Sequence, residues 1–435
     1  MTRWLPVATA ALIALPLAVE PAWAVAPSVT RHVLPNGMTV LVREHPVAAV
    51  VAVSLQVRAG SRFETAATAG ITNLLVRSLV RGSTKRSAVQ LAEAAEEIGG
   101  TVDASGEVET AEIRGEALAR HWEALLGLIA EVVLEPTLAA DEIEKERRLV
   151  LSQIQTRGDT PFPLSFDTVL RDLYGSHPYG RHSLGLRASV ERVTREAVLA
   201  HYREILQAER MVLAVSGQVS RERVLKTAGR LFARLRPSGA GEATPPAEPS
   251  PPGGRRVVER PAQQAQIMVG FLGPGLNDAA YPSVRVLGAL LGGGMAGRLF
   301  VEIRDKRGLA YSLGVITPYR TGPAFFVTYL GTARQNVAAA EAAVLQELER
   351  VRTGPLTADE LARAKAYILG NLALDRRTNA RQAWYLAFFE AVGVGWDFPE
   401  RYARAIEAVT DADVSSAAQR YLRHPTIVLL QPPGR

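Results

Sequence analysis

Cysteine is absent from the 435 residues of this chain, and histidine is rare, with seven copies. The absence of cysteine excludes disulfides, thiol catalysis and cysteine-ligated zinc. After residue 24 no stretch has the roughly 20 apolar, uncharged residues that a membrane-spanning helix needs. No nucleic-acid-binding motif is present, and the net charge of +6 is spread over mixed-charge segments. We therefore expect neither stable membrane insertion nor a nucleic-acid partner.

The longest apolar run lies at the start of the chain. Arg3 precedes an almost uninterrupted apolar stretch from Trp4 to Val19, and Ala22-Trp23-Ala24 has the small-residue pattern of a cleavage site. This order is typical of a secretory signal peptide, so we expect residues 1–24 to direct export, to the periplasm in a Gram-negative cell. The alternative is an uncleaved membrane anchor, although the run is short and is broken by two prolines.

Proline and glycine are concentrated in one internal stretch, residues 237–256. This composition cannot build a core and predicts a semi-rigid, extended linker. It separates residues 28–236 from residues 257–435, and two domains suit a mature chain of about 410 residues, which exceeds one ordinary core. The sequence thus predicts an N-terminal and a C-terminal domain joined by a proline-rich tether.

The two halves of the chain resemble repeats of one another. Leu138-Ala-Ala-Asp-Glu-Ile143 matches Leu356-Thr-Ala-Asp-Glu-Leu361 at an offset of 218, and Met211-Val-Leu213 matches Ile427-Val-Leu429 at an offset of 216. Ordered matches at a nearly constant offset predict duplicated domains.

Strand patterns and long helical patterns alternate in each half, which predicts the α+β class. We expect each domain to be a largely antiparallel sheet with helices packed on one face. A capping box of Ser87 and Gln90 predicts the start of one helix, which ends at Gly99-Gly100. The other expected helices cover 119–134, 139–157, 196–207, 280–291, 333–352 and 357–375. The expected strands cover 49–57, 110–115, 211–215, 265–272, 310–317 and 324–330.

The stretch from Gly70 to Gly82 predicts an amphipathic helix with an unusual second face. On that face Asn73, Val76 and Arg77 have the spacing of the inverted zinc-peptidase motif His-x-x-Glu-His. In such a motif two residues four apart share a metal, and the carboxylate between them polarises its water. The amide of Asn73, the alkyl side chain of Val76 and the cationic side chain of Arg77 cannot bind a metal and polarise its water in this way. The alternative is an amphipathic helix with no relation to a metal site.

The motifs around this helix point to a family. Leu34-Pro-Asn-Gly-Met38, Gly60-Ser-Arg-Phe-Glu64 and Gly82-Ser-Thr-Lys85 flank it. With them the chain resembles the pitrilysin/insulinase (inverzincin) peptidases, close to the two-domain subunits of mitochondrial processing peptidase and of bacterial heterodimeric zinc proteases. The resemblance covers residues 28–435. It implies two homologous domains that close like a clamshell around an extended substrate.

The resemblance also assigns the lost zinc-site positions. Asn73 and Arg77 stand where zinc-binding histidines belong, and Val76 stands where the catalytic glutamate belongs. Gln153 stands where the third ligand, a glutamate, belongs, in the run Glu146-Arg-Arg-Leu-Val-Leu-Ser-Gln-Ile154. We therefore expect no catalytic residue, no metal and no cofactor in this chain.

One pair of histidines offers another metal site. His177 and His182 lie five residues apart in a loop that contains Pro178 and Gly180, which is poor spacing for helical ligands. The segment resembles the His-Pro-Tyr-Gly loop of the family, so we interpret it as structural.

The second half of the chain keeps a segment of the family. Val301-Glu-Ile-Arg-Asp-Lys-Arg-Gly-Leu-Ala-Tyr-Ser312 resembles the segment that carries the family's Arg/Tyr pair, here Arg304 and Tyr311. The resemblance implies that both side chains reach toward substrate and transition state at the zinc of a facing domain. Without the family, a surface arginine and a core tyrosine would be the simpler interpretation.

The loss of the metal site and the retention of the Arg/Tyr segment predict a division of labour. We expect a non-catalytic subunit of an exported heterodimeric zinc metallopeptidase, inactive alone, that supplies Arg304, Tyr311 and half of the chamber. Its partner would be a homologous catalytic subunit with an intact motif and bound zinc, acting on peptides or unfolded proteins. The alternative is a peptide-binding or structural scaffold with no proteolysis, like the related core subunits of respiratory complexes.

Overall fold

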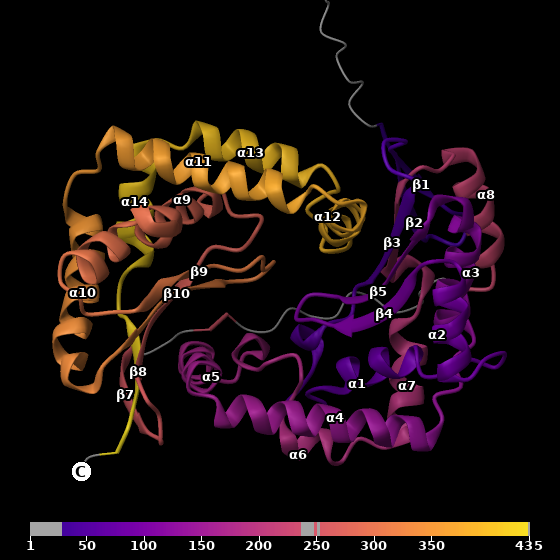
Figure 1. Cartoon of the computed structure of the whole chain (residues 1–435), viewed down its shortest axis with the longest axis horizontal. Coiled ribbons are helices and arrows are strands. Elements are labelled where there is room, and N and C mark those ends of the chain that lie inside the picture. The colour runs from indigo at the N-terminus through magenta and orange to yellow at the C-terminus, as the bar shows by residue number, and fades with distance from the viewer. Residues whose placement is uncertain (1–27, 236–247, 250–252, 434–435) are drawn as a thin grey trace, which may run out of the picture.

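The computed structural model describes residues 28–235, 248–249 and 253–433 (Figure 1). The predicted signal peptide, residues 1–24, and most of the predicted linker, residues 237–256, lie outside the described residues. The last residues of that predicted linker, from Gly254 on, already belong to a strand of the C-terminal half.

The N-terminal half is built on a six-stranded sheet with the strand order β1-β2-β6-β3-β5-β4. Only β2 and β6 pair in parallel, and the other neighbours are antiparallel. The bounds are β1 (Val29–Val33), β2 (Thr39–Glu44), β3 (Val50–Val57), β4 (Thr101–Gly106), β5 (Ala111–Leu118) and β6 (Met211–Gly217).

The C-terminal half repeats this topology in a five-stranded sheet, β7-β11-β8-β10-β9. Its only parallel pair, β7 with β11, occupies the place of β2 with β6. The bounds are β7 (Gly254–Glu259), β8 (Ala265–Gly273), β9 (Ser312–Ile316), β10 (Ala324–Thr332) and β11 (Thr426–Gln431). The predicted duplication and the largely antiparallel α+β architecture are confirmed.

Helices pack around the two sheets. In the N-terminal half they are α1 (Ile71–Leu79), α2 (Ala88–Glu97), α3 (Trp122–Leu134), α4 (Ala140–Asp159), α5 (Pro161–Tyr174), α6 (Arg187–Val190), α7 (Arg195–Ile205) and α8 (Arg221–Leu231). In the C-terminal half they are α9 (Tyr281–Gly292), α10 (Val337–Thr353), α11 (Ala358–Asp375), α12 (Asn379–Ala391), α13 (Phe398–Ala408) and α14 (Asp411–Tyr421). The capping box predicted at Ser87 and Gln90 is present at the start of α2.

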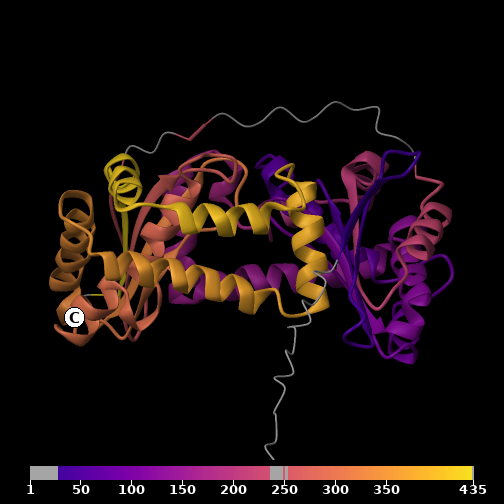
Figure 2. The same cartoon turned by 90° about the horizontal axis from the view of Figure 1, so that it is seen from above.

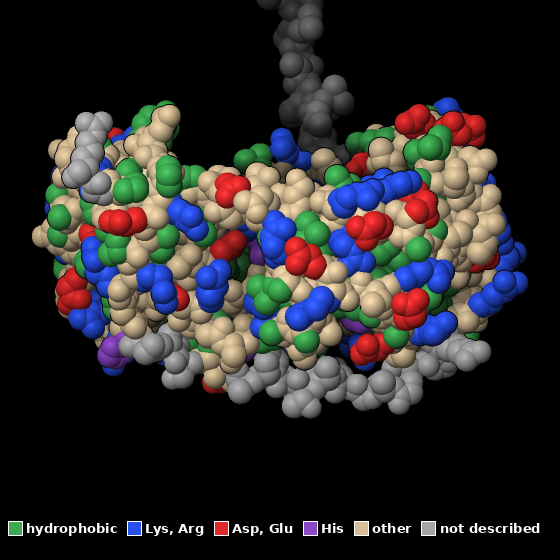
Figure 3. Space-filling view, turned by 90° about the horizontal axis from the view of Figure 1, so that it is seen from below, with side chains coloured by type: hydrophobic (Ala, Val, Ile, Leu, Met, Phe, Trp, Pro, Cys, Tyr) green, Lys and Arg blue, Asp and Glu red, His purple; other side chains and the backbone are tan. Residues whose placement is uncertain are grey.

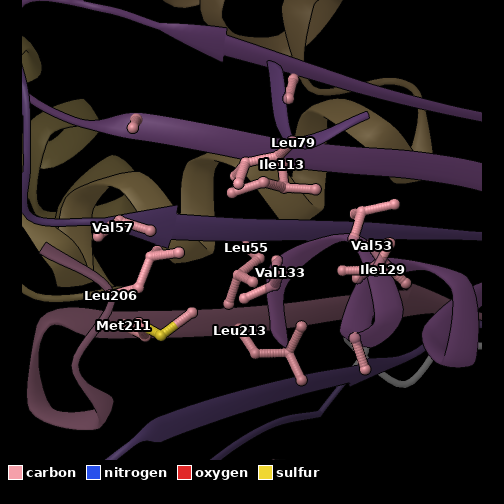
Figure 4. Close-up of a cluster of buried hydrophobic side chains, with 14 of the residues drawn as sticks. Val53, Leu55, Val57, Leu79, Ile113, Ile129, Val133, Leu206, Met211 and Leu213 are labelled. Atoms are coloured by element: carbon pink, nitrogen blue, oxygen red, sulfur yellow. The ribbon is translucent and has the colours of Figure 1, made fainter. Parts of the chain in front are cut away.

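The N-terminal core lies between the sheet and the helices on its outer face, among them α1, α3 and α8 (Figure 4). Alternate residues of β3, among them Val53 and Leu55, point toward Ile129 and Val133 of α3, and all four side chains are buried. The intervening residues Ala52, Ser54 and Gln56 necessarily face the other side of the sheet, because strand side chains alternate. The core thus fixes which face of β3 is directed toward the C-terminal half.

The inner face of each sheet is covered by one helix from the other half (Figures 1 and 2). Helix α12 packs on β3 and β6, whereas α5 packs on β8 and β11. Leu386 of α12 is buried with Leu41 and Val212, and Val169 of α5 lies so close to Gly270 that a Cβ there would be 3.0 Å from Val169 Cγ2. The starts of α5 and α12 are 218 residues apart, which is the offset of the repeat. The sequence predicted helices on one face only, so this reciprocal exchange is a new feature.

A buried carboxylate joins the two halves through side chains. Glu109, in the turn between β4 and β5, accepts hydrogen bonds from Arg62 Nη1 at 2.7 Å, Tyr179 Oη at 2.6 Å and Thr321 Oγ1 at 2.9 Å. Because Thr321 belongs to the C-terminal half, this cluster and the exchanged helices hold the halves in one arrangement.

Charges of both signs are mixed on the molecular surface (Figure 3). On α4, for example, Lys145 pairs with Glu142 at 2.5 Å and Arg147 pairs with Glu144 at 2.8 Å. This agrees with the interpretation of the mixed-charge helices as solvated faces. Within the described residues no helix has the length and apolar character required to cross a bilayer.

Candidate functional site

The helix that carries the zinc-motif positions, α1, is held at its N-terminus by Glu64. One carboxylate oxygen accepts from Gly70 N at 2.7 Å and the other from Thr72 N at 2.9 Å. These are amides that a helix leaves without internal partners, and a negative charge there also suits the helix dipole. Glu64 ends the motif Gly60-Ser-Arg-Phe-Glu64, so the motif serves to fix the start of α1.

One side of α1 lies directly against the edge strand β4. A Cβ added to Gly106 would come within 2.7 Å of Asn73 Cα, so only glycine permits this approach. The Asn73 side chain is buried there, and its Oδ1 has no hydrogen-bond partner in the described part of the chain. Val76 is buried within the N-terminal core.

Arg77 and Gln153 come together at the junction of α1 with α4. Arg77 Nη1 donates to Gln153 Oε1 at 3.3 Å, and Arg77 Nε donates to Glu146 Oε2 at 2.8 Å. The second oxygen of Glu146 accepts from Arg81 Nε at 2.6 Å. The Glu146 side chain is only 2% exposed, so two guanidinium groups neutralise a buried carboxylate.

Glu146 is the residue of this site that the sequence reasoning did not single out. It stands seven residues before Gln153, which is two helical turns and therefore the same face of α4. That spacing, within the run already compared with the family, was the available signal.

These residues do not fit a zinc ion. An arginine has no lone pair to offer, and its charge would repel a divalent ion about 4 Å away by roughly 8 kcal/mol at an effective dielectric near 20. Val76 cannot accept a proton, and the carboxylate of Glu146 is already held by two arginines. In the described residues no group of three His, Asp or Glu side chains is arranged to hold a metal.

The histidine loop forms turns. His177 Nδ1 accepts from Tyr179 N at 3.1 Å, and His182 Nδ1 accepts from Leu184 N at 3.1 Å. Each ring thus stabilises the backbone two residues further on, as expected for a structural loop.

Arg304 and Tyr311 lie side by side in the segment before β9. The Arg304 guanidinium carbon is 5.3 Å from the centre of the Tyr311 ring and 4.6 Å from that of Phe300. Tyr311 is 74% exposed, which is unusual for a large aromatic side chain. No hydrogen bond or ion pair involves the Arg304 side chain among the described residues, so its N–H groups remain available.

An ion pair anchors the segment that leads to Arg304. Arg298 donates two hydrogen bonds to Glu360 at the start of α11, at 2.5 and 2.9 Å. These bonds lower the pKa of Glu360 to about 2. Beyond this anchor, in the described part of the chain, Arg304 lies over the rings of Phe300 and Tyr311.

Arg77 and Arg304 lie in different halves of the chain. Arg77 is on α1, whereas Tyr311 directly precedes β9, and Figure 1 shows these elements well apart. The chain therefore does not bring Arg304 and Tyr311 to its own zinc-motif positions.

Comparisons with known proteins agree with this architecture. The family model described as "Insulinase (Peptidase family M16)" matches residues 39–186, and the model "Peptidase M16 inactive domain" matches residues 192–368. An uncharacterized zinc protease of Mycobacterium bovis is 30% identical over 408 residues, 93% of this chain and 92% of that protein. One of Rickettsia bellii is 28% identical over 388 residues, 89% of this chain and 93% of that protein.

Solved structures show the same fold. A protease from Helicobacter pylori has a TM-score of 0.88 at 20% identity, covering 93% of this chain and 100% of that one. A peptidase M16 inactive domain from Pseudomonas fluorescens has a TM-score of 0.85 at 24% identity, covering 94% of this chain and 98% of that one. The chain therefore belongs to the M16 peptidase family of insulinase and pitrilysin, as a non-catalytic member whose zinc-motif positions hold Asn73, Val76, Arg77 and Gln153.

Proposed function

We propose that this chain is the non-catalytic subunit of an exported heterodimeric zinc metallopeptidase, and that it presents Arg304 and Tyr311 to the substrate of a catalytic partner. The observation that carries the proposal is the free state of the Arg304 guanidinium. It lies over the rings of Phe300 and the exposed Tyr311 and makes no hydrogen bond among the described residues.

The chemistry of this pair suits peptide-bond cleavage at a neighbouring metal site. A guanidinium donates several hydrogen bonds in a fixed plane to peptide carbonyls. A phenol hydroxyl can donate to an oxyanion that develops in the transition state. Both groups act on substrate without a metal of their own, so a chain with no zinc can contribute them.

The sheet of the N-terminal half offers a binding place for an extended peptide. Strand β4 lies at the sheet edge and pairs only with β5 among the described strands. An extended segment can pair with such an edge through backbone hydrogen bonds, with alternate side chains in pockets. Peptides and unfolded proteins therefore form the substrate class.

The partner would be a homologous M16 chain with an intact His-x-x-Glu-His motif and bound zinc. The apolar segment and cleavage-site pattern in residues 1–24 support export, to the periplasm in a Gram-negative cell. Zinc chemistry would reside wholly in the partner, because the positions on α1 and α4 of this chain do not suit a metal.

Reconstitution tests this function. The mature chain is purified alone and after co-expression with a zinc-motif relative from the same genome, and zinc content and peptide cleavage are measured. We expect a metal-free, inactive chain and an active pair. Changing the motif glutamate of the relative to glutamine is the control, and it must abolish cleavage.

Two results would contradict the proposal. Stoichiometric zinc and cleavage by the lone chain would show a working site in this subunit. A stable, metal-free complex that binds peptides and cuts none would instead establish a scaffold.

A further inference from the structure

A large cavity lies on the outer side of the N-terminal sheet, where Figure 1 shows α2, α3 and α8. These helices and the end of α7 enclose a volume of about 1270 Å³. Helix α12 packs on the other face of the sheet, so the cavity is outside the space between the two halves. The volume exceeds the range of compact small-ligand sites, about 300–1,000 Å³, and therefore suits an elongated ligand.

The long wall of this cavity is the outward face of α3. Its lining residues run from Ala124 to Glu135, which is about 16 Å along the helix at 1.5 Å per residue. Gly127 lies within this face, and a Cβ added there would meet no atom within 4 Å. An unbranched alkyl chain fits such a wall, because each methylene that leaves water is stabilising. The larger apolar side chains around the cavity are those of Ile98, Leu128, Leu134, Leu206, Leu231 and Leu235.

Cations outnumber carboxylates around the cavity, five to three. Two of the cations are paired with two of the carboxylates, Lys85 with Glu135 at 2.9 Å and Arg86 with Glu131. The third carboxylate is that of Glu97. None of the three remaining cations has a hydrogen bond or an ion pair among the described residues, and these are Arg203, Arg230 and Arg234. The unpaired groups of the wall therefore carry a net positive charge.

The unpaired arginines lie toward the C-terminal end of α3. A hydrogen bond from Lys85 lowers the pKa of Glu135 at this end, and the charge of Arg234 adds to the lowering. Arg230 is four residues before Arg234, in the last turn of α8. The residue before Arg203, Tyr202, donates its hydroxyl to the carbonyl oxygen of Val133 at 2.9 Å. The positive charge thus occupies one end of the cavity, and the apolar wall of α3 leads away from it.

The C-terminal half holds a smaller counterpart with a different charge pattern. Leu422 repeats Leu206 at the offset of 216 and lines a cavity of about 530 Å³. Both guanidinium groups of that cavity are engaged, because Arg352 pairs with Glu349 and Arg423 donates to a main-chain carbonyl of α14. In the described part of the chain, the larger volume and the unpaired arginines therefore distinguish the N-terminal cavity from its repeat.

We propose that the N-terminal cavity binds a long-chain fatty acid, with the alkyl chain along α3 over Gly127 and the carboxylate held by Arg203, Arg230 and Arg234. A guanidinium group suits this ligand, because it binds a carboxylate through two parallel hydrogen bonds and is weakly hydrated. The site is independent of the proposed peptidase function, because it lies outside the space between the halves and needs no partner subunit.

Displacement of cis-parinaric acid, a fluorescent fatty acid, from the full mature chain tests this site. Myristate, tetradecanol and tetradecyltrimethylammonium share one chain length and serve as competitors below their micelle concentrations. We expect myristate to displace the probe at about tenfold lower concentration than tetradecanol, because charge-assisted hydrogen bonds are the stronger kind. The ammonium compound should be the weakest competitor, since the arginines repel it.

A glycine substitution tests the position of the alkyl chain. Gly127→Leu places a side chain in the cavity and should weaken binding of the probe at least about tenfold, because the two groups would overlap. The change should not unfold the protein, since leucine is a better helix former than glycine. Gly370→Leu is the matched control, because a Cβ at that position in α11 also meets no atom within 4 Å. It should bind the probe as the unmodified chain does.

A charge substitution tests the carboxylate site. The double variant Arg230→Gln, Arg234→Gln should reduce the preference for myristate over tetradecanol to less than about threefold. The double variant Lys226→Gln, Arg363→Gln removes two exposed cations outside the cavity and should keep the full preference. Circular dichroism melts of all variants confirm that they fold.

Four results would overturn the proposal. Equal displacement by myristate and tetradecanol would show that the site does not recognise an anion. Unchanged binding by Gly127→Leu would place the probe elsewhere on the protein. Displacement by lysophosphatidylglycerol at a lower concentration than by myristate would assign the cavity to a phospholipid. Absence of probe binding to the mature chain would remove the site altogether, and none of these results affects peptide cleavage by the reconstituted pair.

Discussion

The two halves of this molecule share one topology but use their arginines in opposite ways. In the N-terminal half Arg77 is tied to the buried Glu146 and to Gln153. In the C-terminal half Arg304 lies over two aromatic rings, and its N–H groups have no hydrogen-bond partner among the described residues. The difference teaches that an arginine in such a segment can either stabilise the fold by pairing with a buried carboxylate or remain available to bind a substrate. The available hydrogen-bond capacity distinguishes the two roles.

The sharpest test of this comparison is alanine substitution of each arginine in the reconstituted pair. Arg304→Ala should lower kcat at least about a hundredfold, as expected for the loss of a donor to the transition state, without dissociating the complex. Arg77→Ala should leave kcat nearly unchanged. Steady-state kinetics and size-exclusion chromatography give both readouts, and equal kcat values for Arg304→Ala and the unmodified pair would refute the substrate role.

The free energy of unfolding should depend on the Arg77 site more than on Arg304, the reverse of the order expected for kcat. Glu146→Ala leaves two arginines without their buried counter-charge and should cost about 3–4 kcal/mol of unfolding free energy. Urea unfolding of the lone chain measures this loss. Glu123→Ala removes one partner of an exposed pair with Arg223 and should cost less than about 1 kcal/mol. If both variants unfold alike, Glu146 is not a structural centre of the site.

The exchanged helices allow a test across the two halves. Leu386→Ala in α12 should cost about 2–3 kcal/mol, because it removes a buried side chain from a packed face. Amide exchange should accelerate in β3 and β6, although the changed residue belongs to the C-terminal half. Leu374→Ala, at an exposed site on α11, is the matched control and should alter neither quantity. If amide exchange accelerates only in the C-terminal sheet, α12 does not stabilise the N-terminal sheet.

The smallest expected effect concerns the anchor of the Arg304 segment. Because the pKa of Glu360 is lowered to about 2, its ion pair with Arg298 stabilises the folded state fully above pH 4.5 and loses this contribution as the pH falls toward 2. Solvent screening limits the contribution to roughly 1 kcal/mol. The urea midpoint of Glu360→Gln should therefore fall less between pH 6 and pH 3 than that of the unmodified chain. If the urea midpoints of the two proteins change with pH in the same way, the ion pair of Arg298 with Glu360 does not stabilise this segment.

Local patterns predicted most of the elements, whereas the long-range arrangement was not accessible from them. The strand pattern at 49–57 corresponds to β3, and the capping box at Ser87 begins α2. Helix α5 was missed because Pro161 and a second proline two residues later resemble a turn, although proline is tolerated in the first turn of a helix. Its packing on the other half has no signature in local periodicity.

The candidate site was likewise predicted only in part. The family motif identified the positions of Arg77 and Gln153, and these side chains are in contact. It did not indicate that Glu146 neutralises Arg77, because the partner of a buried charge is determined by how two helices cross.

The reciprocal position of α5 and α12 has a consequence for the continuity of the polypeptide. Each half holds a helix that belongs to the other, so the covalent connection through residues 237–253 is not what keeps the halves together. A protease that nicks this stretch would leave a two-piece particle of unchanged shape. By the same reasoning, the gene would tolerate fission at this point, with the two products assembling by fragment complementation.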